Sequence, residues 1–386
     1  MKPMSFMLIA GEPSGDLLAA ELAGALRRAA ANDPRFPGLR FFGAGGPKMA
    51  QAGIDIAFDL TQHAVIGISD VLKNYFKFRR LFNQLLALAV ERRPHALIGV
   101  DYGGFNLRFA RAARAVVRDN PFSGWNPKII QFVSPQVWAS RPGRAALLAA
   151  NHDLLLSIFP FEKEWYAQRA PSLPVVFVGH PLVERLAVSS TPRPEPRPDS
   201  PLILLLPGSR KSELLRHLPV ILPALKLIRA GLPGAKAKII LPDESLASLA
   251  KSAAHDVEIQ VGRLPEALAH ADLAIASTGT VTMECAFFGV PALTLYKTSW
   301  LTYQIARRIV TVKSLTMPNL LAGAPVYPEF IQSDAAPERI SQAALQLLRN
   351  ESQRRQIKVQ LRRVIASLGG PGAADRAARA ILDLFR

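Results

Sequence analysis

Short, nearly continuous apolar segments alternate with longer segments of helical periodicity along most of the chain. In the first half the apolar segments lie at residues 6–11, 39–45, 96–101, 129–134, 154–159 and 175–179. Such runs are typical of parallel strands that are buried on both faces. Ala- and Leu-rich segments such as 17–30 separate them at helix length. The pattern therefore predicts βαβ units and a doubly wound parallel sheet.

The pattern is interrupted at residues 189–201 and then begins again. This segment contains five prolines, which exclude a helix interior or a central strand, so we expect a stiff surface linker. Further apolar segments follow at 202–206, 237–241, 257–261, 273–276 and 292–296. The sequence thus predicts two Rossmann-like domains, 1–188 and 202–368. A length of 386 residues also favours two cores over one.

The C-terminal segment is predicted to be helical with one break. Residues from Ser352 onward are basic and helical in pattern, and Gly369-Gly370-Pro371-Gly372 interrupts them before a last helix near 373–385. The break allows residues 369–386 to cross back to the N-terminal domain or to a partner chain. In the second case this helix would hold a homodimer together.

Composition adds a strong charge to this picture. The formal net charge of +17 predicts attraction to nucleic acid, a phosphorylated substrate or an acidic membrane surface, although an arginine-rich surface alone would also produce it. The single cysteine, Cys285, fits a reducing cytoplasm. The apolar run at residues 6–10 is too short for a signal peptide, and no run reaches the roughly 18 residues of a transmembrane helix.

The turn Pro207-Gly208-Ser209-Arg210 has the composition of a phosphate-binding loop. It follows a predicted strand and precedes a helix. Free backbone N–H groups at the helix start, together with the Arg210 guanidinium, can therefore bind an anion. Ser209 as an ordinary N-cap is an equally good interpretation.

A second turn, Ser277-Thr278-Gly279-Thr280, also opens a helix, and Glu284 lies one turn further. A carboxylate in this position could accept hydrogen bonds from both hydroxyls of a ribose. The other interpretation is a capping box, which requires a spacing of three residues, whereas Thr280 and Glu284 are four apart. Together the two turns predict a nucleotide site in the second domain.

In the first half, Gly11-Glu12-Pro13-Ser14-Gly15-Asp16 follows the first predicted strand. It lacks the GxGxxG spacing and the P-loop lysine. Ser14 and Gly15 could contact a sugar or pyrophosphate, or Ser14 or Asp16 could cap the following helix. Asp101 ends another strand beside two glycines, where a carboxylate is well placed as a general base, although a turn aspartate is the commoner role.

Three further side chains follow strands of the first half. Trp138 and Arg141, in the segment 133–141, suggest recognition of a ring or a phosphate. His180, in Gly179-His180-Pro181, could approach a diphosphate or act as an acid–base group, although a lone histidine is more often structural. We expect no metal site, because the chain has no CxxC, no HExxH and no carboxylate pair at ligand spacing.

Residues 71–86 form a basic amphipathic pattern. Its apolar face consists of Val71, Tyr75, Phe78, Phe82, Leu85 and Leu86, and the other side carries Lys73, Phe76, Lys77 and Arg80. A helix of this kind can lie at an anionic membrane surface. The alternative, a core-packed helix with a solvated basic face, is equally consistent with the pattern.

The motifs occur in an order that resembles the lipid-A-disaccharide synthases, inverting glycosyltransferases of the two-domain GT-B class. The matching segments are AGEPSGD at Ala10, GAGGPKM at Gly43, AVIGISDVL at Ala64, VDYGGFN at Val100, VSPQVWASR at Val133, FPFEKEWY at Phe159, FVGHP at Phe177, LLPGSRKSE at Leu205, STGTVTMEC at Ser277 and MPNLLAG at Met317. The resemblance implies two Rossmann-like domains facing a central cleft.

The resemblance also implies the reaction and its residues. The donor would be UDP-2,3-diacylglucosamine, the acceptor 2,3-diacylglucosamine 1-phosphate (lipid X), and the products the β-1′,6-linked disaccharide 1-phosphate and UDP. Asp101 would be the base, while Arg210, Glu284 and Asn319 match residues linked to the UDP-donor site. No metal or other cofactor is expected. We expect a cytoplasmic protein associated peripherally with the anionic inner-membrane surface.

The chain departs from the family pattern at Gly103-Gly104, Ser140 and Ala324-Pro325-Val326. The first two departures concern acceptor or acyl-chain fit, and the third lies near the donor site. A UDP-N-acetylglucosamine 2-epimerase is the competing enzyme class, because it shares the domain plan and similar turns. A basic lipid- or nucleic-acid-binding protein is the non-enzyme alternative, but no nucleic-acid-binding module is recognisable, and we expect no nucleic-acid partner.

Overall fold

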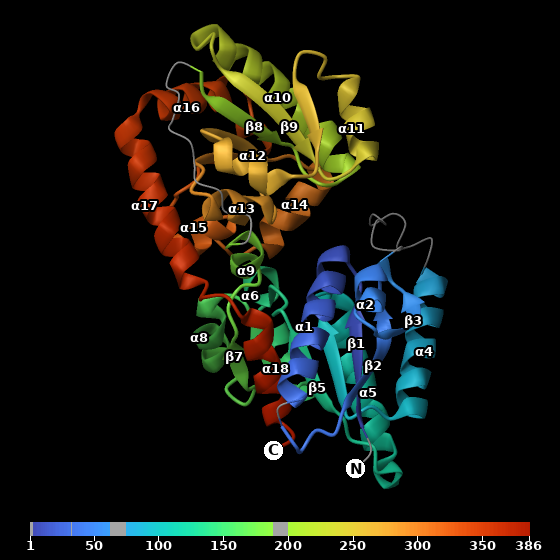
Figure 1. Ribbon diagram of the computed structural model, residues 1–386. Helices are drawn as coiled ribbons and strands as arrows, with labels where there is room; N and C mark the ends of the chain where they lie inside the picture. Colours follow the sequence, from blue (N-terminus) through green and yellow to red (C-terminus); the bar gives the residue numbers. More distant parts are fainter. Residues whose placement is uncertain (1–2, 32, 62–74, 188–199) are drawn as a thin grey trace. The chain divides into compact units, whose positions relative to one another are not determined.

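The computed structural model describes residues 3–31, 33–61, 75–187 and 200–386. The chain divides into two compact units (Figure 1): unit 1 comprises Met1–Pro181 and Gly370–Arg386, and unit 2 comprises Leu182–Gly369. Most of the predicted linker lies outside the described residues. The division falls before it, so that the short helix α9 (Leu182–Ala187) groups with unit 2 rather than with the first domain.

Unit 1 is built on a seven-stranded sheet with the order β3-β2-β1-β4-β5-β6-β7, in which all neighbours are parallel. The strands are β1 (Met4–Ala10), β2 (Leu39–Gly45), β3 (Asp55–Asp59), β4 (Ala96–Val100), β5 (Lys128–Phe132), β6 (Leu154–Ser157) and β7 (Val175–Phe177). The helices are α1 (Pro13–Ala31), α2 (Pro47–Gln51), α4 (Tyr75–Arg92), α5 (Gly103–Asp119), α6 (Val137–Ser140), α7 (Arg144–Asn151), α8 (Pro160–Arg169) and α18 (Ala373–Asp383), with the 3-10 turn η2 (Pro121–Ser123).

Unit 2 repeats this plan with six parallel strands in the order β10-β9-β8-β11-β12-β13. The strands are β8 (Leu202–Leu206), β9 (Lys236–Leu241), β10 (Glu258–Val261), β11 (Leu273–Ser277), β12 (Ala292–Tyr296) and β13 (Glu329–Ile331). The helices are α9, α10 (Lys211–Gly231), α11 (Glu244–Lys251), α12 (Leu264–His270), α13 (Val281–Phe287), α14 (Trp300–Ile309), α15 (Met317–Ala322), α16 (Pro337–Arg349) and α17 (Glu351–Ser367), with η3 (Gln332–Asp334).

The predicted strands are all present, and the structure adds β3 and β13, which the apolar pattern did not indicate. Both are edge strands. The residues of β3 are exposed or half-buried, and β13 has only three residues. An edge strand is covered on fewer sides, so its sequence carries less of the apolar signal on which the prediction depends. The doubly wound fold is confirmed in both units.

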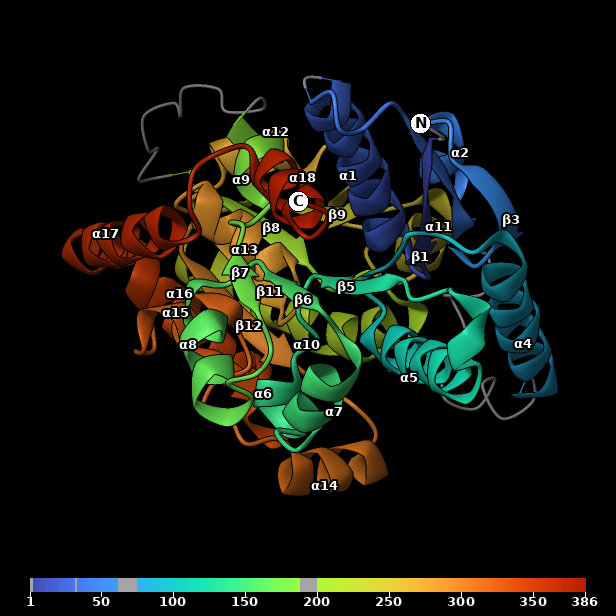
Figure 2. The ribbon, with the colours of Figure 1, turned by 90° about the horizontal axis from the view of Figure 1, so that it is seen from below.

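The last helix, α18, lies beside α1 in two views of unit 1 (Figures 1 and 2). Arg28 pairs with Asp375 at 2.7 Å, and the Phe385 ring stacks on that of Phe6 with centroids 5.5 Å apart. Arg376 donates to the carbonyl oxygens of Val178, Gly370 and Pro371, each at 2.7 Å. In this structure the glycine-rich break thus returns the C-terminus to unit 1 of the same chain.

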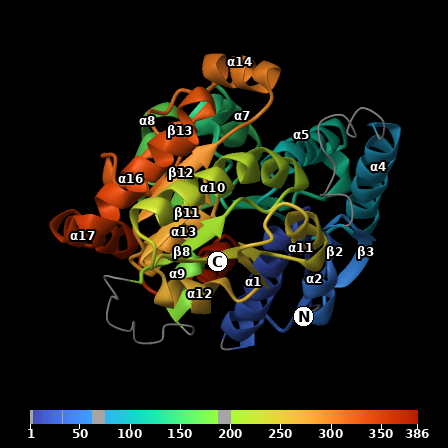
Figure 3. The same cartoon turned by 90° about the horizontal axis from the view of Figure 1, so that it is seen from above.

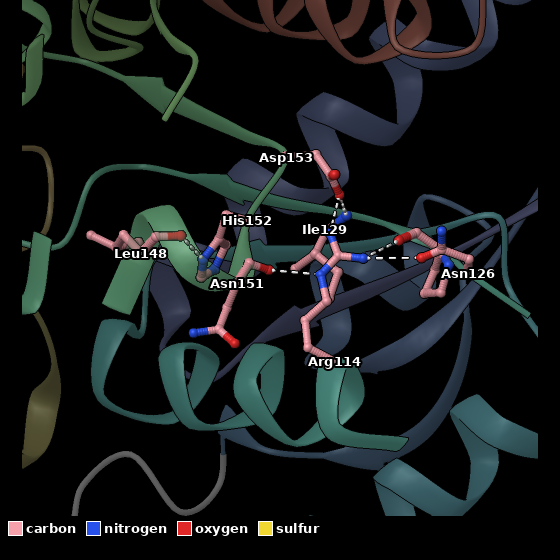
Figure 4. A network of polar contacts seen from close by, with 8 residues as sticks. Arg114, Asn126, Ile129, Leu148, Asn151, His152 and Asp153 are labelled. Carbon is pink, nitrogen blue, oxygen red and sulfur yellow. Dashed lines mark hydrogen bonds and ion pairs between the residues drawn. The ribbon is translucent and has the colours of Figure 1, made fainter. Parts of the chain in front are cut away.

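A polar network between α5 and the starts of β5 and β6 holds α5 in place (Figure 4). The Arg114 guanidinium donates to the carbonyl oxygens of Asn151 and Pro127 and to the Asn126 side chain, and it pairs with Asp153. Asp153 also accepts the Ile129 backbone N–H at 2.7 Å. The far end of α5 is therefore fixed to the starts of two strands, which matters because α5 begins directly after Asp101.

Among the described residues, no helix is both long and apolar enough to cross a bilayer.

Candidate functional site

Unit 2 contains a pocket of about 570 Å³ beyond the carboxyl ends of its strands. Open parallel α/β sheets bind ligands at this edge. Six of the seven residues that the sequence assigned to the donor line this pocket: Gly208, Ser209, Arg210, Gly279, Thr280 and Glu284. The two turns, 70 residues apart in sequence, therefore form one site.

The turn after β8 is shaped around the carboxylate of Glu213. Gly208 has φ +119°, and a Cβ atom there would lie 2.2 Å from Glu213 Oε2. The Ser209 backbone N–H donates to that same oxygen at 3.1 Å, and Arg210 approaches Glu213 at 3.6 Å. A negative group thus already sits where the backbone N–H and the guanidinium converge. The Arg210 side chain is 73% exposed, so it is free to reach a ligand.

A buried histidine that the sequence analysis missed supports this turn. His217 Nδ1 lies 2.6 Å from the Pro207 carbonyl oxygen, and its Nε2 accepts the Lys297 backbone N–H at 3.1 Å. Only a neutral imidazole with its proton on Nδ1 can make both bonds. Burial lowers the pKa of His217, which favours this neutral form. The histidine thereby connects the phosphate-type turn to the segment that follows β12.

Glu284 lies on α13 at the inner side of the pocket. Burial raises its pKa to about 7, and the charge of Arg185 on α9 opposes that rise. Thr280, at the start of α13, makes no side-chain capping bond. The capping-box alternative is therefore absent, and both Thr280 and Glu284 face the pocket.

A third turn of the same kind lines the pocket. Gly262 and Arg263 follow β10 with left-handed φ values of +66° and +52°, and α12 begins at the next residue. Sequence reasoning did not select this turn, because Gly-Arg-Leu-Pro lacks the hydroxyl residues of the other two. Only its position in the sequence could have predicted it, because a glycine turn lies between a strand and a helix here, as at Gly208 and Gly279.

Asn319 is the donor candidate that does not line the pocket. It is 3% exposed, its Nδ2 donates to Tyr327 O at 2.8 Å and to Glu329 Oε1 at 2.9 Å, and its Oδ1 accepts the Tyr327 N–H at 2.8 Å. The side chain therefore ties α15 to the segment before β13. In this structure its position is that of an internal bridge rather than a pocket-lining group.

In unit 1, Asp101 and Tyr102 both adopt left-handed conformations, with φ +51° and +47°. Two consecutive non-glycine residues in this region are strained and need support from their surroundings. The support comes from two buried amides: Asn106 Nδ2 and Gln131 Nε2 donate to the Asp101 carbonyl oxygen at 2.8 and 2.9 Å. Burial also raises the pKa of the Asp101 carboxyl, which would suit the general base that the sequence predicts at this position.

The glycines of the first turn let it approach this corner closely. A Cβ atom on Gly15 would lie 3.3 Å from Val100 O and 3.6 Å from Asp101 Cβ, and one on Gly11 would meet the Tyr102 ring at 2.3 Å. Ser14 is exposed in the first turn of α1. Asp16 does not cap α1. Its carboxylate accepts hydrogen bonds from the backbone N–H groups of Gly46, Lys48 and Met49 at the start of α2.

The other acceptor candidates differ in exposure. Trp138 is buried, and its indole N–H donates to the buried Glu162 carboxyl at 3.0 Å, so it lies in a core cluster rather than on an open surface. Burial raises the pKa of Glu162 to about 7. His180 is half-buried with its ring 5.3 Å from that of Phe159, whereas Arg141 is exposed.

The candidate membrane-facing residues fall at the start of α4. Phe76 is 79% exposed and Arg80 is exposed, while Leu85 further along the helix is buried in the core. Lys73 and the side chain of Lys77 lie outside the described part of the structure. The later part of the helix therefore packs in the core, as the second interpretation predicted, and a membrane role for its start stays a prediction.

No group of three or more His, Cys, Asp or Glu residues suited to a metal ion occurs within the part of the chain that the structure covers.

Solved structures with this fold include enzymes of two classes, epimerases and glycosyltransferases. S. aureus MnaA in a co-structure with UDP matches with a TM-score of 0.63 at 12% identity, covering 100% of this chain and 97% of that one. UDP-GlcNAc 2-epimerase from Neisseria meningitidis bound to UDP-GlcNAc gives 0.58 at 12% identity, with 100% and 99% covered. The calicheamicin glycosyltransferase CalG4 gives 0.59 at 14%, with 99% of each chain covered. These matches confirm the GT-B fold, and the epimerase alternative has only this distant likeness in its favour.

Sequence comparison separates the two classes. The model of the family described as lipid-A-disaccharide synthetase matches residues 6–382. The lipid-A-disaccharide synthase of Trichlorobacter lovleyi is 35% identical over 395 residues, which cover 99% of this chain and 98% of that protein. The enzyme of Geobacter sulfurreducens is 35% identical over 391 residues, covering 98% and 97%. The chain therefore belongs to the lipid-A-disaccharide synthase family of glycosyltransferases.

Proposed function

We propose that the protein transfers 2,3-diacylglucosamine from UDP-2,3-diacylglucosamine to the 6-hydroxyl of 2,3-diacylglucosamine 1-phosphate. The observation that carries this proposal is the division of chemistry between the two units. Unit 2 has a pocket with an anion-attracting turn and a deep carboxylate, whereas unit 1 has a supported, partly desolvated aspartate. Membership of the family supplies the reaction class, and these sites supply a donor end and a base.

Unit 2 would hold the UDP part of the donor. The Ser209 N–H and the Arg210 guanidinium would bind the diphosphate in place of the Glu213 carboxylate. Glu284 would accept hydrogen bonds from both ribose hydroxyls. Two solved structures of the same fold contain UDP or UDP-GlcNAc, which supports a nucleotide ligand. Arg263 lines the same pocket and would add positive charge. These groups would stabilise the charge that develops on UDP as it leaves, so we expect no metal ion to be required.

Unit 1 would supply the base. The Asp101 carboxylate takes the proton of the acceptor 6-hydroxyl while that oxygen forms a bond to the anomeric carbon. The bond between this carbon and the UDP oxygen breaks on the opposite face, and the electron pair leaves with UDP. One displacement inverts the configuration at the anomeric carbon and yields the β-linked product. Gly15 lets the start of α1 pack closely against Val100 and Asp101.

An arginine cluster of unit 1 would fit the phosphate of the acceptor. Arg108 lies on α5, Arg141 follows α6 and Arg144 opens α7, and the packing of Leu107 against Val137 and Ala145 brings these elements together. Burial and the charges of Arg141 and Arg108 lower the pKa of Arg144. None of the three pairs with a carboxylate in the described chain, so a phosphomonoester would relieve their mutual repulsion.

Gly103 explains how the arginine-bearing segment reaches the base. A Cβ atom at Gly103 would lie 2.8 Å from Pro135 Cβ, whereas one at Gly104 would meet nothing within 4 Å. The departure from the family pattern at Gly103 therefore permits a closer contact between the start of α5 and the segment that leads to Arg141. The departures at Ser140 and at Ala324-Pro325-Val326 have no comparable explanation in the structure.

A membrane role for the start of α4 completes the proposal. Both substrates carry acyl chains, and the exposed Phe76 and Arg80 suit peripheral contact with an anionic membrane surface.

The test is a product assay with both lipid substrates. We expect equimolar UDP and lipid disaccharide 1-phosphate, with activity retained in EDTA. Release of epimerised sugar from UDP-N-acetylglucosamine without any disaccharide would support the epimerase instead. Loss of activity in EDTA that a divalent ion restores would contradict the metal-independent mechanism.

A further inference from the structure

Helix α14 carries an apolar surface that the proposed reaction does not use. The helix follows β12 in unit 2, and none of its residues is buried. Trp300, Leu301 and Ile305 have exposed fractions of 72%, 65% and 49%. At 3.6 residues per turn these three positions fall on one side of the helix. Figures 2 and 3 both show α14 at the margin of unit 2, away from its sheet.

The charged residues in the segment that contains α14 all have one sign. Residues 297–313 contain no Asp or Glu, but they contain Lys297, Arg307, Arg308 and Lys313. Arg307 and Arg308 are exposed in the last turn of α14, and Arg307 lies over the Tyr303 ring at 5.6 Å. Neither arginine has a carboxylate partner in the part of the molecule that is described. The surface is therefore complementary to something both apolar and anionic.

We propose that α14 is an interfacial helix through which unit 2 contacts a bilayer that contains anionic lipid. A helix with Trp and aliphatic residues on one side and basic residues beside them lies in the plane of such an interface, and Trp favours the headgroup level because its ring is apolar and its N–H is polar. The net charge of +17 strengthens the attraction to anionic lipid. The contact is separate from the start of α4, which belongs to unit 1.

The experiment follows Trp300 on vesicles of phosphatidylcholine with and without phosphatidylglycerol, in the absence of substrates. With anionic vesicles we expect the emission of the full-length protein to shift to shorter wavelength and to be quenched by phosphatidylcholine brominated on its acyl chains. Trp300→Phe should remove most of this response, since Trp125 and Trp138 are buried and Trp165 is half-buried between Tyr166 and Arg169 of unit 1. An equal response from both proteins would overturn the proposal. Shielding of Trp300 from aqueous acrylamide before vesicles are added would also overturn it, because a protein surface would then cover the helix.

Matched variants test the binding itself. Trp300→Ser/Leu301→Ser/Ile305→Ser should weaken partitioning onto anionic vesicles at least about tenfold. The control, Leu227→Ser/Leu249→Ser/Val359→Ser, changes three other exposed apolar side chains of unit 2 and should leave partitioning unchanged. Equal loss in both triple variants would contradict a specific role for α14. Because no substrate is present, these outcomes are independent of the reaction proposed above, which the product assay tests in detergent.

Discussion

The donor pocket of unit 2 and the Asp101 corner of unit 1 use the same topology in different ways. In unit 2, three strand–glycine–helix turns present backbone N–H groups, arginines and a deep carboxylate to one pocket of about 570 Å³. In unit 1, a single aspartate sits in a strained turn that two buried amides hold by its carbonyl oxygen. The proposed binding site for a large charged ligand is thus spread over many groups, whereas the proposed site for proton transfer depends on the exact placement of one.

The largest effect should come from the single group. Asp101→Asn removes the base with little change in volume, so we expect kcat to fall about 10²–10⁴-fold, while UDP binding to unit 2 is unchanged. Steady-state kinetics and calorimetry with UDP give the two quantities. Near wild-type turnover in Asp101→Asn would show that another group takes the proton.

The pH dependence of Glu284 tests the pocket of unit 2, where the proposed binding is spread over many groups. Its pKa of about 7 lies above the ordinary value of 4.5, so the native state binds the extra proton between these values, and stability falls as the pH rises from 4.5 to 7. We expect Glu284→Gln to weaken UDP binding at pH 8 about 10–100-fold and to raise the free energy of unfolding there by about 1–3 kcal/mol.

Below pH 6 the effect of Glu284→Gln on UDP binding should shrink, because the wild-type side chain is then protonated. The gain in the free energy of unfolding should decline from pH 7 to pH 4.5, where the unfolded chain takes up the proton as well. Glu338→Gln, an exposed glutamate of the same unit, should change neither quantity. UDP affinities that differ between wild type and Glu284→Gln by the same factor at pH 8 and pH 6 would argue against a carboxylate acting on the ribose.

The arginine cluster should affect the acceptor selectively. We expect Arg144→Gln to raise the KM for 2,3-diacylglucosamine 1-phosphate about tenfold or more, since it loses a charge-assisted contact, and to leave the KM for the donor unchanged. Arg118→Gln, on the exposed end of α5 next to Asp119, serves as the control. If Arg144→Gln raised the KM equally for an acceptor that lacks the phosphate, the cluster would not recognise the phosphate.

Asn106 tests whether the strained turn needs its support. Asn106→Leu removes a hydrogen bond of 2.8 Å to the Asp101 carbonyl oxygen, so we expect kcat to fall about tenfold with both KM values unchanged. Asn151→Leu removes a comparable side-chain bond to Leu147 on α7 and should cost stability without lowering kcat. If kcat fell in proportion to the loss of stability in both variants, Asn106 would have only a structural role.

The smallest effect concerns stability alone. Burial lowers the pKa of His152 from 6.5 to about 4, so the unfolded chain binds the extra proton between these values and stability falls as pH drops from 6.5 towards 4. Unfolding in urea, followed by tryptophan fluorescence, gives the free energy of unfolding at each pH. Between pH 7 and pH 5 this free energy should fall in His152→Gln by about 1–2 kcal/mol less than it falls in the wild type. The exposed His255→Gln should behave as wild type.

The two regions also differ in how far the sequence predicted them. Gly208-Ser209-Arg210 and Gly279-Thr280 with Glu284 were readable as ligand turns, because each follows a strand and opens a helix, and parallel topology brings such turns to one edge. Arg263 and His217 were missed, since an arginine after glycine and a histidine within a helix carry no local signal of their own. Trp138 was predicted as a recognition residue, but the fold buries its indole against Glu162.

The sequence by itself determined the two sheets, the glycine-rich break before the last helix and the family, whereas the return of that helix to unit 1 came from the structure. These follow from apolar periodicity, turn residues and ordered motifs, all of which are local along the chain. Only the tertiary structure decided that Asp16 caps α2 rather than α1, that Asn106 and Gln131 hold Asp101, and that α14 is left without a core to cover. Each of these depends on which side chain meets which backbone group across long sequence separations, and burial and hydrogen bonding fix that pairing only when the chain has folded.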